Sequence, residues 1–165
     1  MAEAKDIKIY IDSVRYEVEA SLFSDGDDGE DLLKLIESGG ELEPEKMQMN
    51  TLGKLCEKDG RTEISYEETE LTGMEGSSTV ISFDQKNEGV VTMLRTGLVS
   101  TALVFEAGKR HHCVYSTPYM PFEVCVHTLS VKNDVAANGY LEIDYIVEIR
   151  GARAERTKFS MKLNA

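Results

Sequence analysis

The sequence has no surplus of basic residues: 18 Lys and Arg stand against 30 Asp and Glu, and the formal net charge is −12. Phosphate backbones and anionic lipid headgroups are bound by clustered Lys and Arg. No basic stripe with interleaved aromatic residues occurs along the chain. The composition therefore predicts that the partner is neither a nucleic acid nor a membrane surface.

Long apolar runs and a secretion signal are also missing. No stretch of about 18 apolar residues is present, so no membrane-spanning helix is expected. The opening residues, MAEAKDIKIYID, lack an apolar segment after a basic start, which predicts a cytoplasmic protein. The three cysteines are then expected to be reduced thiols. A chain of 165 residues with 41% hydrophobic residues is typical of one globular domain, residues 1–165.

Enzyme signatures are missing as well. The chain has no nucleophile elbow, no phosphate-binding glycine loop and no HExxH motif. The acidic run DGDDGED at 25–31 resembles a calcium loop, but Glu30 and Ile36 stand where an EF-hand requires Gly and Glu. We therefore predict no cofactor, and a protein that is not an enzyme.

What the chain has is period-two alternation of apolar and polar residues, which is typical of half-buried strands. In KDIKIYID the three isoleucines share one face, and the apolar parity then switches to Val14, Tyr16 and Val18, which predicts a bulge near Ser13. Strands are expected at 5–18, 46–57, 61–70, 78–84, 89–96, 100–106, 110–116, 122–131, 139–150 and 154–163.

Short turns separate these strands, and Asp59-Gly60 is the pair that a type I′ hairpin prefers. Short connections imply antiparallel neighbours, because parallel pairing needs long crossovers. A meander of this size tends to curl or close, which also removes its edges. We therefore predict an all-β, antiparallel up-and-down barrel of about 8–10 strands, with a two-sheet sandwich as the alternative.

The acidity is concentrated in one segment. Residues 17–45 hold eleven acidic residues and one basic residue, whereas the rest of the chain is nearly neutral. Within this segment, DDGEDLLKLIESGG predicts one short helix with an aspartate cap and a terminal Gly-Gly pair. Residues 19–45 are expected to form an insertion in the barrel. An alternative function is a protein–protein interaction module in which this segment binds a basic partner.

The stretch HHCVYSTPYMPFEVCVHT at 111–128 holds all three histidines and two of the three cysteines. If Thr117 pairs with Pro121, the two cysteines lie opposite each other and so do two histidines, as a tetrahedral zinc site requires. A different loop length scatters this set, and the compact spacing of zinc ligands is absent. We expect no metal site. The alternative, which depends on register, is a zinc set made of His111, Cys113, Cys125 and His127.

Two charged residues continue apolar strand faces: Glu68 in the strand at 61–70 and Arg95 in the strand at 89–96. Inside a barrel each charge would be costly alone and would pair with the other. The interpretation that we favour for these two residues is that both lie at strand ends and extend into solvent, and the buried pair is the alternative. The polar side chains expected to bind a ligand inside the barrel are Tyr66, Glu68, Arg95, Tyr115 and Tyr145.

Several runs occur in a familiar order: GKLCEKDGRTEISYEETELTGMEGSSTVISF, MLRTG, FEAGKRHHCVYSTPYMPFEVCVHT and LEIDYIVEI. Over about residues 46–163 they resemble the YwiB-like family, a bacterial domain of unknown function with a calycin-like, lipocalin-like β-barrel. The resemblance implies a barrel with at most a small-molecule cavity, and no catalytic residue. The leading hypothesis is a barrel that binds a small, partly apolar molecule. A solid interior without a cavity would contradict it.

Overall fold

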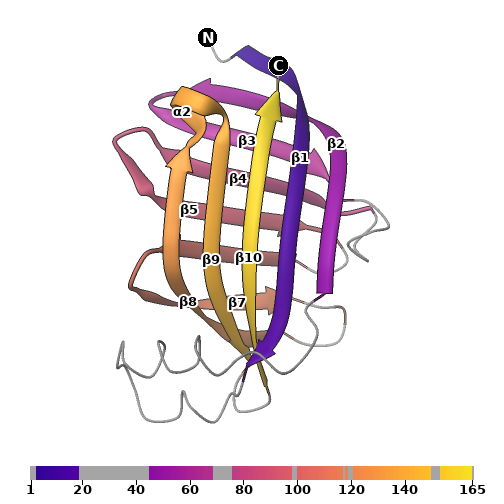
Figure 1. Cartoon of the computed structure of the whole chain (residues 1–165), viewed down its shortest axis with the longest axis vertical. Helices are drawn as coiled ribbons and strands as arrows, with labels where there is room; N and C mark the ends of the chain where they lie inside the picture. Colours follow the sequence, from indigo (N-terminus) through magenta and orange to yellow (C-terminus); the bar gives the residue numbers. More distant parts are fainter. Residues whose placement is uncertain are drawn as a thin grey trace.

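The computed structural model describes residues 3–18, 45–68, 76–97, 100–116, 118, 121–149 and 153–164. These residues form one closed, antiparallel β-barrel (Figure 1). The predicted all-β barrel is confirmed. The helix predicted within residues 19–45 lies outside the described residues.

Ten strands make up the described part of the barrel, and they agree with the ten predicted strands to within a few residues at each end. One short helix, α2 (Val135–Asn138), connects β8 to β9. The strands are β1 (Glu3–Val18), β2 (Glu45–Lys58), β3 (Arg61–Glu67), β4 (Ser78–Asp84), β5 (Asn87–Thr96), β6 (Ser100–Glu106), β7 (Arg110–Ser116), β8 (Pro121–Asp134), β9 (Tyr140–Ile149) and β10 (Arg153–Asn164).

The topology is a simple meander in which each strand pairs with the next along the chain. β1 pairs with both β2 and β10, and this closes the sheet. In Figure 1, β8, β9, β10 and β1 run along the long axis of the molecule, and strands of the β3–β7 region cross behind them. The two-sheet sandwich is therefore wrong. Closure pairs the first strand with the last, which removes the exposed edges of an open meander.

The turn between β2 and β3 has the predicted chemistry. Asp59 has φ of 52° and Gly60 has φ of 77°, so both central residues are in the left-handed region, as a type I′ turn requires. This tight turn fixes the register of the hairpin, in which Lys58 pairs with Arg61.

The predicted bulge near Ser13 is wrong. The register between β1 and β10 continues without a break from Lys8 to Val18. Ser13 is buried and continues the inward face of the preceding isoleucines, whereas Tyr16 lies on the outer face beneath the guanidinium of Arg156, 5.6 Å from the ring centroid. The switch in apolar parity has a different cause: at this point the inward face of β1 changes from apolar to polar.

The same change occurs along most of the strands and divides the barrel interior into two parts. We call them the closed half, which is apolar and filled, and the cavity half, which contains polar side chains and open space. The closed half consists of buried, inward-facing residues of the core: Ile7, Ile9, Ile64, Ile81, Phe83, Val91, Phe105, Leu141, Ile143 and Met161.

Candidate functional site

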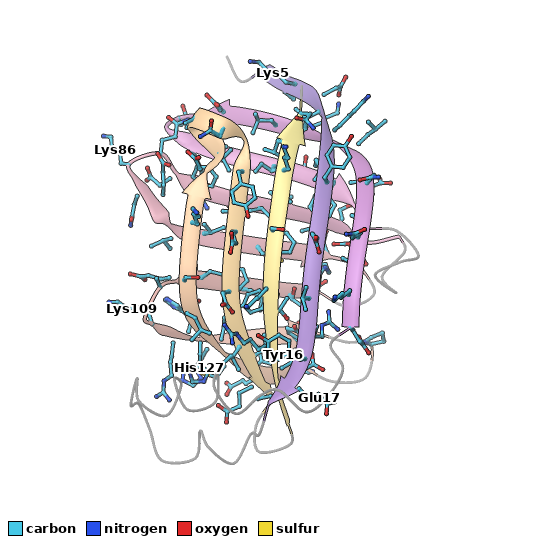
Figure 2. All side chains as sticks on the ribbon, viewed as in Figure 1. Lys5, Tyr16, Glu17, Lys86, Lys109 and His127 are labelled. Carbon is cyan, nitrogen blue, oxygen red and sulfur yellow. The ribbon has the colours of Figure 1, made fainter. Side chains whose placement is uncertain are left out.

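A cavity of about 690 Å³ lies inside the barrel, at the end where odd-numbered strands end and even-numbered strands begin. In Figure 2 this is the end of β1 marked by Tyr16 and Glu17, opposite Lys5. An antiparallel meander brings the ends of all its odd-numbered strands together. The cavity is lined by all five of the predicted ligand-binding residues: Tyr66, Glu68, Arg95, Tyr115 and Tyr145.

Glu68 and Arg95 form an ion pair in the wall of this cavity. Arg95 Nη2 lies 3.2 Å from Glu68 Oε1, and the two side chains are 17% and 2% exposed respectively. Thr79, on β4, lies between them: its hydroxyl donates to Glu68 Oε1 at 2.6 Å and accepts from Arg95 Nε at 3.4 Å. The two charges therefore pair inside the barrel, and the favoured prediction that both extend into solvent is wrong.

Three tyrosines bring hydroxyl groups to the same cavity. Burial raises the pKa of Tyr66, Tyr115 and Tyr145, and the negative charge of Glu68 raises that of Tyr66 further. The phenols therefore stay protonated at neutral pH and act as hydrogen-bonding groups without charge. The ring of Tyr145 packs on Phe105 of the closed half, with ring centroids 4.6 Å apart, and this contact holds it in place.

The mouth of the cavity carries charges that sequence reasoning missed. Arg15 on β1 and Glu155 on β10 line the cavity, with Arg15 Nε 3.8 Å from Glu155 Oε2, and Lys46 lines it from β2. The sequence held a signal for Arg15, because uninterrupted alternation from Ile11 places it on the inward face. The predicted bulge assigned it to the opposite face.

Thr79 was also missed. It lies on the inward face of β4, two residues before Ile81, and it is fully buried. Alternation alone could have placed this hydroxyl inside the barrel. Its position between Glu68 and Arg95 depends on the registers of β3, β4 and β5, in which Thr79 pairs with Tyr66 on one side and Arg95 on the other.

The rest of the wall is largely apolar and includes three flexible methionines. Methionine side chains adapt to irregular shapes, so this wall can accommodate ligands of more than one shape. The apolar lining consists of Ile11, Met47, Met49, Met93, Leu103, Val147 and Phe159.

The register between β7 and β8 separates the four candidate zinc ligands. Ser116 pairs with Pro121, so the predicted pairing of Thr117 with Pro121 is wrong. In this register Cys113 pairs with Val124, and Cys125 pairs with His112. Paired residues share a face of the sheet, so His111 and Cys113 lie on one face and Cys125 and His127 on the other. The Cys2His2 arrangement does not form. Within the described ranges, no three His, Cys, Asp or Glu side chains gather as metal ligands.

Three of these four residues have surroundings that differ from a metal site. Cys113 is 5% exposed in the core, and burial raises the pKa of its thiol. His127 is buried at the end of the molecule where Tyr16 lies (Figure 2), and its Nε2 is 3.3 Å from Glu148 Oε2. His111 Nε2 lies 3.4 Å from Glu106 Oε1. The two histidine–glutamate contacts connect neighbouring strands, β6 with β7 and β8 with β9.

The acidic segment 19–45 falls outside the described residues apart from Glu45, so the hypothesis that it binds a basic partner stays a prediction. Among the residues that the structure describes, no helix is long and apolar enough to cross a membrane.

Comparisons with known proteins agree with the fold. The crystal structure of the YwiB protein from Bacillus subtilis matches with a TM-score of 0.64 at 17% sequence identity, over 98% of this chain and 94% of that chain. At this identity the likeness shows the fold alone. No curated protein matches the chain. The family described as domain of unknown function DUF1934 matches residues 34–161, which is most of the chain. The resemblance to YwiB-like proteins is thus confirmed, and the chain belongs to the DUF1934 family of β-barrel domains of unknown function.

Proposed function

We propose that this protein binds a small, partly apolar molecule inside its barrel and does not act on it chemically. The observation that supports the proposal is the convergence of five polar side chains and an apolar wall on one cavity of about 690 Å³. Ligand cavities are typically about 300–1,000 Å³, and most of their walls are apolar with a few placed polar groups. This cavity has both the size and the composition of a binding site.

The state of the polar groups supports binding over catalysis. Glu68 accepts hydrogen bonds from Arg95 and Thr79 at the same oxygen, so this carboxylate is engaged in a structural network. The raised pKa of Tyr66 keeps its phenol protonated and therefore a weak nucleophile.

Native mass spectrometry of the protein purified from its host tests the proposal. Val147→Trp fills part of the cavity with an indole, and Leu94→Trp adds the same group on the outer face, where Leu94 is 44% exposed. We expect an additional bound mass on the wild type and on Leu94→Trp, and its loss from Val147→Trp. The same three proteins are titrated with a fluorescent apolar dye. A wild type with neither bound mass nor saturable dye binding would contradict the proposal, as would equal binding by Val147→Trp.

A further inference from the structure

The charges that face the inner part of the cavity cancel each other. Glu68 and Arg95 are in contact at 3.2 Å, and both side chains are largely removed from water. A buried ion pair is tolerated because each charge offsets the desolvation of the other. A carboxylate brought to Arg95 would also approach Glu68 and be repelled, and an ammonium brought to Glu68 would be repelled by Arg95. The pair therefore disfavours a ligand head of either charge.

The two partners differ in what they present to the cavity, because the Arg95 side chain is 17% exposed whereas that of Glu68 is only 2% exposed. A guanidinium has five N–H donors and no acceptor. Arg95 directs one donor at Thr79 and one at Glu68, which leaves three N–H groups for water or a ligand. A ligand head is thus best matched if it accepts hydrogen bonds and carries no charge.

We infer that the ligand carries an uncharged carbonyl head, an amide or an ester, which accepts hydrogen bonds from Arg95, and an apolar remainder in the cavity. This inference rests on the proposed function and specifies the chemical class of the ligand. Met93 precedes Arg95 on the same face of β5, and the cross-strand partner of Met93 is Leu103 of β6. The apolar remainder lies along these two side chains and Phe159.

Displacement of a bound fluorescent dye by three probes of equal chain length tests the inference: decanamide, decanoate and decylammonium. For the wild type we expect decanamide to displace the dye at a concentration about tenfold or more below that of either charged probe, since misplaced charge costs affinity. A wild type that prefers decanoate or decylammonium overturns the inference and leaves the proposed function intact. A wild type that binds neither the dye nor any probe overturns both.

Two substitutions connect this selectivity to the ion pair. Glu68→Gln keeps the shape of the side chain and removes its charge, so Arg95 is no longer neutralised and the preference shifts to decanoate. Arg95→Gln leaves Glu68 as the only charge of the pair and shifts the preference to decylammonium. The second variant keeps the inference testable if the first does not fold, as judged by circular dichroism.

Glu63→Gln is the matched control, because Glu63 is an exposed residue of β3 that does not line the cavity. This variant changes the net charge by the same amount as Glu68→Gln. We expect it to keep the order of the three probes seen with the wild type. If folded Glu68→Gln and Arg95→Gln also keep that order, or if Glu63→Gln alters it as strongly, the ion pair does not set the selectivity and the inference is overturned.

Discussion

The two halves of the barrel interior are built from the same strands and differ in what those strands direct inward. On β3 and β4, Ile64 pairs with Ile81 in the closed half, and two residues farther along Tyr66 pairs with Thr79 in the cavity half. Both isoleucines are fully buried, whereas Tyr66 lines open space. The filled apolar part of the interior and the part that holds polar groups and open space are thus separated along these strands. The apolar half holds the barrel closed, which permits the other half to keep polar groups and space.

The comparison predicts that truncating a side chain costs much more in the closed half. Leu141 is fully buried and pairs with Met161, so Leu141→Ala leaves a void that the neighbouring strands cannot fill. We expect a loss of roughly 3–5 kcal/mol in the free energy of unfolding. Met47→Ala, at the partly open cavity wall, should lose less than about 1 kcal/mol, because its side chain already borders open space.

Urea unfolding followed by circular dichroism measures both values. The slope of the free energy against urea concentration should be unchanged, since neither variant alters the surface exposed on unfolding by much. Equal losses at the two positions would show that the interior is packed uniformly and that the two halves do not differ.

The second prediction concerns the ion pair that stabilises the cavity half. Arg95→Met removes the partner of Glu68, whose side chain is 2% exposed, and should cost roughly 2–4 kcal/mol of the free energy of unfolding. The double variant Glu68→Leu, Arg95→Met removes both charges and should recover most of this loss, because no unpaired charge remains. A double variant as unstable as the single one would mean that the methionine, and not the unpaired Glu68, causes the loss.

The third prediction concerns the place where β1, β2 and β3 approach closely. A Cβ at Gly53 would collide with the side chain of Ile9 and with the carbonyl oxygen of Ser65. The backbone oxygen cannot move without disturbing the pairing of β2 with β3, so Gly53→Ala should cost roughly 1–3 kcal/mol. Gly89→Ala is the control, because a Cβ there meets no atom within 4 Å. Thermal unfolding should give a lower midpoint for Gly53→Ala than for Gly89→Ala, and equal midpoints would rule out the collision.

Alternation in the sequence was enough to predict the strands and to place five polar side chains in the interior, and the short turns between about ten strands predicted the antiparallel barrel. Alternation works because a strand directs every second residue inward whatever its neighbours are. What it missed depends on information that alternation does not carry. The position of Thr79 between Glu68 and Arg95 follows from the registers of three strands. The zinc hypothesis was wrong because the cross-strand register between β7 and β8 depends on the length of their connection.

The predicted bulge was wrong because the inward face of β1 changes from apolar to polar where the closed half meets the cavity half. The inward polar residues were interpreted as outward-facing, with a bulge that changes which residues of the strand face the interior. In a barrel with a solid interior that interpretation would be reasonable, because polar residues are then excluded from the inward face. Here Ser13 and Arg15 continue inward because the cavity half begins at this point. An apparent parity switch in a barrel strand can therefore mark the edge of a cavity.

The smallest predicted effect is a pH dependence of the free energy of unfolding that comes from a tyrosine of the cavity half. Tyr145 lines the cavity, and burial raises its pKa above the ordinary value of 10. The unfolded chain therefore loses this proton first, so the stabilisation is complete below about pH 10 and is lost as the pH rises through the folded-state pKa. As the pH rises through and above about 10, this tyrosine should therefore contribute a decrease in the free energy of unfolding. The free energy of unfolding of Tyr145→Phe should fall less steeply with pH in this range than that of the wild type, whereas Leu141→Ala should keep the wild-type slope. A Tyr145→Phe variant as sensitive as the wild type would place the alkaline titration elsewhere in the barrel.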